Sequence, residues 1–189
     1  GNISIKAGTV DFGQNTVLDT SAGAWVESTG KVNLGNGGNI GLDTGGDVTF
    51  PTQMRAYGFN KGGELSLSTS RNIQIGGQDP GVGFWLPESF FEQNGFSKYN
   101  ITSTGDDSQV VIGDPSGAAT VIHPKMQTLQ LRGDYAGQRS ASQVSSIVAS
   151  PVLLAEGQRA PASVKFSAFA NSTTFGSLTL LENATIRTD

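Results

Sequence analysis

Few residues of this sequence have the types and spacing that chemistry on a substrate requires. His123 is the only histidine and there is no cysteine, so thiol chemistry and a cysteine-ligated zinc site are excluded. No Gly-x-Ser-x-Gly turn is present to carry a serine nucleophile. We therefore expect His123 to be a structural residue, and the chain to be no enzyme and to hold neither a cofactor nor a metal.

Paired acids are the remaining catalytic candidates, because glycoside hydrolysis uses two carboxyl groups about 5 to 10 Å apart across a sugar groove. Three pairs stand close together in the sequence: Asp43 with Asp47, Glu88 with Glu92, and Asp106 with Asp107. Aspartate is also common in turns, where its side chain bonds the local backbone. The sequence favours solvated surface acids, with a carbohydrate-active enzyme as the alternative.

Residues suited to binding a partner gather in two places. Residues 83–96 hold the densest aromatic cluster, from which we take Trp85, Phe90 and Phe91 as candidate ligand contacts. Such clusters more often belong to a core, so that alternative stays open. The second candidate is Arg132, Gly133 and Asp134, which match the tripeptide that integrins recognise, although short motifs also arise by chance.

The elements that must position these residues follow a repeated phrase, in which a turn residue precedes apolar, small or polar, and again apolar residues. The phrase occurs at residues 1–5, 38–42, 63–67, 71–75 and 176–180. This alternation predicts short strands with one buried face. A repeated strand-and-turn unit predicts a solenoid, whose units bury their apolar faces by stacking on one another.

We therefore predict an all-β chain, a right-handed parallel β-helix with short helical and loop excursions. A β-sandwich is the minor alternative, since Asn36-Gly37 is a candidate hairpin turn. One domain is expected over residues 1–189. It divides into regular coils at 1–77, an excursion with a short helix at 78–104, coils at 105–132, a second excursion at 133–161, and coils at 162–189.

Local signals within this plan give three finer predictions. Pro87 and Gly95 suit the start and the end of a short helix. A helical turn is expected before Pro151. Asparagines at one position of the phrase are expected to bond from coil to coil, as a ladder; they are Asn2, Asn39 and Asn72.

Composition limits the classes of partner. The chain has 26 glycines and a net charge of −4, and its 12 Lys and Arg residues are scattered. Nucleic-acid binding needs clustered positive charge, so we expect no nucleic-acid partner. No long apolar run is present, and we expect no membrane insertion.

These phrases resemble filamentous-haemagglutinin-type exoproteins of two-partner secretion systems. The resemblance covers essentially the whole chain and is most specific in its middle, as a module from the C-terminal part of such exoproteins. It rests on residues 1–8, 18–19, 24–26, 56–63, 89–99, 151–154 and 186–189.

The resemblance implies a piece of a large secreted β-helix at the bacterial cell surface, which crosses the outer membrane through a β-barrel transporter. It implies a structural and binding module of an adhesin, in cell adhesion or biofilm, with virulence as its setting. Expected partners are host or matrix glycans or a cell-surface receptor, an integrin among them. The alternatives are a polysaccharide-acting β-helix enzyme and a passive stalk that presents a distal toxin.

Overall fold

The computed structural model describes residues 1–132, 148–170 and 175–188. This part of the chain is all-β, as predicted, and its one helical element is a single 3-10 turn, η1 (Glu88–Phe91). Its strands are β1 (Ile3–Ala7), β2 (Val10–Asp11), β3 (Val17–Asp19), β4 (Ala24–Val26), β5 (Val32–Leu34), β6 (Ile40–Thr44), β7 (Val48–Thr49), β8 (Gln53–Arg55), β9 (Glu64–Thr69), β10 (Ile73–Ile75), β11 (Phe84–Leu86), β12 (Lys98–Ser103), β13 (Gln109–Ile112), β14 (Thr120–Ile122), β15 (Thr128–Arg132), β16 (Val148–Val152), β17 (Ser163–Ala168), β18 (Ser177–Leu180) and β19 (Ala184–Ile186).

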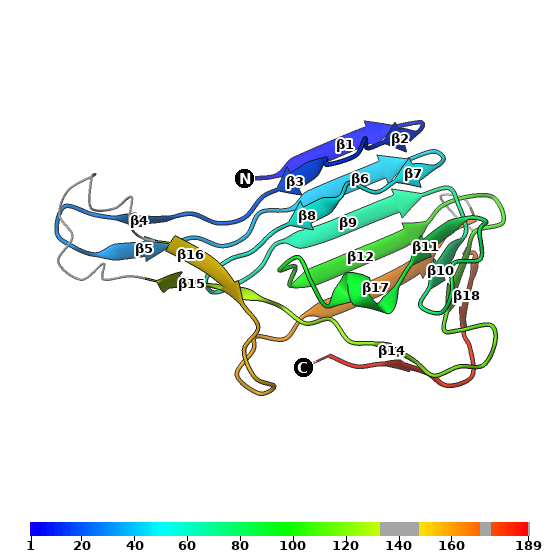
Figure 1. Ribbon diagram of the computed structural model, residues 1–189. Helices are drawn as coiled ribbons and strands as arrows, with labels where there is room; N and C mark the ends of the chain where they lie inside the picture. The colour runs from blue at the N-terminus through cyan, green and yellow to red at the C-terminus, as the bar shows by residue number, and fades with distance from the viewer. Residues whose placement is uncertain (133–147, 171–174, 189) are drawn as a thin grey trace.

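The largest sheet is parallel, with the strand order β1-β6-β9-β12-β17 (Figure 1). Its register aligns Ile3 with Ile40, Ile40 with Leu65, Leu65 with Tyr99, and Tyr99 with Val164. The first three steps along this ladder cover 37, 25 and 34 residues, and the last is the longest. The sheet thus keeps its register while the chain between its strands varies in length.

Four smaller parallel sheets accompany the main one. They are β11-β10-β13-β18, β2-β7, β3-β8 and β14-β19. Side chains alternate between buried and partly exposed along β6 and β9, which is the period of two expected of strands with one buried face. The buried face includes Ile40, Leu42, Leu65, Leu67 and Ile101, each at most 1% exposed, in one apolar cluster.

Two antiparallel hairpins extend beyond the main sheet on one side (Figure 1). One joins β4 to β5 and the other joins β15 to β16. The first corrects the expectation of regular coils throughout 1–77. Gly30, at φ +83°, closes its turn, and its backbone N–H donates to the Glu27 carbonyl at 2.8 Å. A reversal of this kind needs the left-handed backbone that glycine adopts readily.

The predicted short helix between Pro87 and Gly95 is also corrected. Residues 87–94 form only η1 and a following turn, because Asn94 and Gly95 both take positive φ and end the winding. Pro151 lies in β16, opposite Leu129, so residues 148–150 do not form the helical turn predicted before it, and residues 140–147 lie outside the described residues. A proline restricts the residue before it to extended backbone, which suits a strand.

The predicted asparagine ladder exists in a modified form. Asn2 Oδ1 accepts a bond from the Asn39 backbone N–H at 2.9 Å, and Asn39 Oδ1 accepts one from the Glu64 N–H at 3.0 Å. Asn72 Oδ1 accepts from the Gln109 N–H at 3.0 Å in the same way. Each amide therefore bonds the backbone of the next strand along the stack, and not the next amide.

Candidate functional site: a groove beside β8

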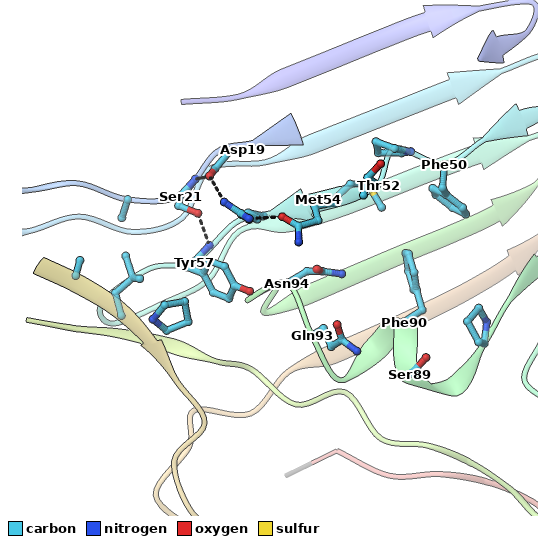
Figure 2. Close-up of a pocket in the computed structure, with 18 residues that line it drawn as sticks. Asp19, Ser21, Phe50, Thr52, Met54, Tyr57, Ser89, Phe90, Gln93 and Asn94 are labelled. Atoms are coloured by element: carbon cyan, nitrogen blue, oxygen red, sulfur yellow. Dashed lines mark hydrogen bonds and ion pairs between the residues drawn. The ribbon is translucent and has the colours of Figure 1, made fainter. Parts of the chain in front are cut away.

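An open groove of about 790 Å³ lies beside β8. Four segments line it: the end of β3 with the residues after it, β8 with its flanking residues, the segment 87–94 that contains η1, and the paired strands β15 and β16. Figure 2 shows Met54 and Tyr57 on the second segment and Phe90 and Gln93 on the third. The groove thus lies where β8 and its partner β3 meet the segment that contains η1 and the β15/β16 pair.

Within the described residues β8 has a strand on one side only, and the groove lies on its other side. β8 pairs with β3, and those two strands make up their whole sheet. In the next passage of the chain, β11 instead joins β10, and η1 follows it. The groove therefore occupies the position in which a further strand could pair with β8.

Polar side chains at one end of the groove form an ion pair and a hydrogen bond with one another. Arg55 Nη1 lies 3.8 Å from Asp19 Oδ2, and Arg55 Nη2 donates a hydrogen bond to Gln53 Oε1. Asp19 Oδ1 also accepts from the Ser21 N–H at 2.8 Å. Among the described lining residues Asp19 is the only acid and Arg55 the only base, so this end of the groove carries no net charge.

The rest of the lining is aromatic and amide. Phe90 and Phe50 lie with ring centroids 5.5 Å apart, and both rings are partly exposed. Burial raises the pKa of the half-buried Tyr57 phenol above 10, so this hydroxyl keeps its proton and can donate a hydrogen bond. Gln93 and Asn94 bring side-chain amides to the same wall (Figure 2). Aromatic faces with neutral donors and acceptors suit ligands that combine apolar and hydroxyl surfaces.

Gly95 fixes the place of the Tyr57 ring. Its φ is +72°, and a Cβ added there would lie 2.2 Å from Tyr57 Cδ1 and 2.9 Å from Tyr57 Cα. Only glycine allows this approach, because any side chain would collide with the ring and its backbone. The next residue back, Asn94, accepts a hydrogen bond at its carbonyl from the Ala56 N–H at 2.9 Å. The excursion is thereby fastened beside the end of β8.

The aromatic candidates separate into three environments. Phe90 lines the groove. Phe91 is fully buried, with its ring centroid 5.1 Å from that of Tyr99, so it belongs to the core. Trp85 is half-buried on β11, away from the groove, and its Nε1 donates to the Gly76 carbonyl at 3.3 Å. Of the three, Phe90 alone lines the groove, and it stays a candidate ligand contact.

The integrin-type tripeptide is described only at its first residue. Arg132 ends β15, where its backbone is in register with Val148. Gly133 and Asp134 lie outside the described residues.

Four of the six paired acids have a basic side chain or a backbone N–H as their partner. Asp43 lies 2.8 Å from Lys6, Asp47 2.7 Å from Arg71, and Glu92 2.7 Å from Lys125. Glu88 Oε1 accepts from the Gly77 N–H at 3.1 Å. Asp106 and Asp107 are exposed, and they line a smaller hollow of about 370 Å³ together with Asp47, which is paired with Arg71 there. His123 is buried, and the described residues include no cluster of three metal-ligating side chains.

Sequence reasoning missed most of the groove. Asp19, Arg55, Tyr57, Gln93 and Asn94 line it, yet none was among the ligand contacts predicted from the sequence. They meet because the register brings Asp19 beside Arg55 and because Ala56 bonds Asn94. The one usable signal was Asn94-Gly95, a turn pair that marks where the excursion returns to the stack.

Within its described residues the chain has no helix of the length and apolarity needed to cross a bilayer. The sequence matched no family model, no curated protein and no solved structure when it was compared with each.

Proposed function

We propose that this chain is a section of a right-handed parallel β-helix and serves as a binding module of a secreted bacterial surface adhesin. The parallel ladder from β1 to β17, with its steps of unequal length, supports the β-helix. In a solenoid each coil contacts its neighbours, and the insertions between strands create binding surfaces. The resemblance to exoproteins of two-partner secretion systems supports an extracellular place for it.

The ligand we propose is a glycan of the host surface or of the biofilm matrix. One observation carries this: the groove beside β8 brings the Phe90 and Tyr57 rings together with the amides of Gln93 and Asn94. A sugar ring has an apolar face that stacks on an aromatic ring, while its hydroxyls need neutral donors and acceptors. The paired charges of Asp19 and Arg55 leave the groove uncharged, which suits a neutral saccharide.

Binding fits this groove better than hydrolysis does. A glycosidase needs a general acid and a second carboxylate on the two sides of the bond that it cleaves. Asp19 is the one carboxylate among the described lining residues, and it faces Arg55. We therefore assign the groove a role in adhesion and no catalytic role.

A glycan array tests the proposal with three proteins: the wild-type chain, Phe90→Ala and Trp25→Ala. Phe90→Ala removes a ring from the groove, whereas Trp25→Ala removes a ring from β4 that is 59% exposed and lies outside it. We expect the wild type and Trp25→Ala to bind the same glycans and Phe90→Ala to lose them. A folded wild-type chain that binds no glycan would refute the proposal and favour a passive stalk.

A further inference from the structure

The wall of the groove formed by residues 87–94, here called the η1 wall, is a short turn. Phe90 and Gln93 of this wall line the groove, whereas Phe91 is buried in the core and Glu92 is not among the described lining residues (Figure 2). Backbone bonds from the Phe90 and Glu92 N–H groups, 3.0 and 3.2 Å long, close the turn. A single 3-10 turn has poor hydrogen-bond geometry, so contacts with the rest of the chain must hold this wall in place.

Lys125 makes two of these contacts. Its backbone N–H donates to the Phe91 carbonyl at 3.0 Å, and its ammonium donates to Glu92 Oε1 at 2.7 Å. The Lys125 side chain is only 25% exposed, so salt and water screen this ion pair less than a pair on the open surface. Lys125 is not itself among the described residues that line the groove, so it acts on the η1 wall from behind.

The stretch that begins at Lys125 also leads to another wall of the groove. β15 follows it, and Leu129 of β15 lines the groove. The fully buried Met126 accepts at its sulfur from the Gly62 N–H at 3.4 Å, and the Leu129 N–H donates to the Gly58 carbonyl at 2.8 Å. This stretch is therefore fixed to the strand stack at two points and to the η1 wall at a third, so it ties two walls of the groove together.

We infer that Lys125 is a positioning residue of the groove: its ammonium, through Glu92, holds the η1 wall where the Phe90 ring reaches a bound glycan. This inference rests on the proposed function and names a residue outside the groove on which binding depends. Removing the ammonium leaves the backbone bond to Phe91 and the buried Phe91 ring in place. The wall is then less ordered before binding, and ordering it takes up part of the binding free energy.

Hydrogen exchange of the ¹⁵N-labelled chain tests the inference without a ligand. Lys125→Met keeps the side-chain stem and removes the charge. Lys98→Met is the matched control, because it removes an ion pair of 3.1 Å with Glu64 on the main sheet, outside the groove. We expect Lys125→Met to speed exchange at the Phe90 and Glu92 N–H groups about tenfold and to leave exchange in β6 unchanged, since the opening is local. Lys98→Met should leave the η1 wall as it is in the wild type.

Two further variants separate the ion pair from the rest of the side chain. Glu92→Gln removes the pair from its other side, and it also serves if Lys125→Met does not fold. It should speed the same exchange, and the double variant should be no faster than either single one, because both remove one interaction. Lys125→Arg should restore slow exchange, since a guanidinium pairs well with a carboxylate. On the glycan array Lys125→Met should bind about three- to tenfold more weakly than the wild type, and Lys98→Met equally well.

The contrary results are distinct. Unchanged exchange at Phe90 and Glu92 in both Lys125→Met and Glu92→Gln would overturn the inference. Equal acceleration throughout β6 would overturn it too, because the ion pair would then contribute only to overall stability. Full glycan binding by Lys125→Met would remove its role in recognition. An array that is empty for the wild type as well would contradict the proposed function, and the exchange data alone would then decide whether Lys125 holds the η1 wall.

Discussion

Replacing Phe91 by alanine should separate the core from the groove more clearly than any other single change. Phe91 is fully buried, and its ring centroid lies 5.3 Å from that of Phe90, 5.1 Å from that of Tyr99 and 6.1 Å from that of Phe166. Removing a buried phenylalanine ring loses its transfer free energy and leaves a cavity, which together cost about 3–5 kcal/mol. Phe90 keeps part of its surface in solvent, so Phe90→Ala should cost roughly half as much.

Urea unfolding followed by circular dichroism measures both costs, provided that the slope of each transition is unchanged. Phe91→Leu serves as the control, because it keeps most of the buried volume and should fall between the wild type and Phe91→Ala. We expect Phe91→Ala to lower stability more than Phe90→Ala does, while Phe90→Ala alone abolishes glycan binding by a protein that is still folded. A cost below about 1 kcal/mol for Phe91→Ala would refute its place in the core.

Three further predictions concern the backbone and two ionisable groups. Gly95→Ala should destabilise the chain by about 2 kcal/mol or more, because it adds a collision with Tyr57 to the strain of positive φ; Gly81→Ala has positive φ but open space and should cost only about 1 kcal/mol. Burial alone would raise the pKa of Glu64, but hydrogen bonds from neighbouring side chains outweigh it and hold the pKa below 4.5. Its stabilisation is therefore present above pH 4.5 and lost as the pH falls through the folded-state pKa, so the urea midpoint of Glu64→Gln should depend less on acid than that of the wild type. Burial raises the pKa of Tyr99 well above 10, so stability should decline as the pH rises past 10, and absorbance should report this phenol's ionisation only when the chain unfolds.

The strands of the main sheet could be predicted from the sequence, because the side chains of each strand report which face is buried. Ile40 and Leu42 alternate with Gly41 and Asp43, and the structure buries the first two and leaves the others partly exposed. The same alternation holds around Leu65 and in β12. This signal is local, so the buried face can be predicted without knowing which strands are neighbours.

Pairing and direction could not be predicted in the same way. Trp25 and Val26 have the composition of a coil strand, yet they form one arm of a hairpin, because the reversal depends on Gly30 and on the partner strand β5. The groove depends on an absence, namely that no strand in the described part of the chain pairs with the second edge of β8. The residue types of β8 do not indicate whether a strand pairs with its second edge, so from the sequence Met54 is predicted to be an ordinary core residue.

The unequal steps of the main ladder have a consequence for engineering. Partners along it are separated by 37, 25 and 34 residues, and then by a longer segment that contains β15 and β16, yet the register does not change. Each doubling of the length of a connecting segment costs only about 0.6 kcal/mol in closure entropy. The hairpin turn at Gly30 is therefore a place where a foreign peptide epitope could be grafted with little loss of stability, and the sheet would display it at a fixed height along the stack.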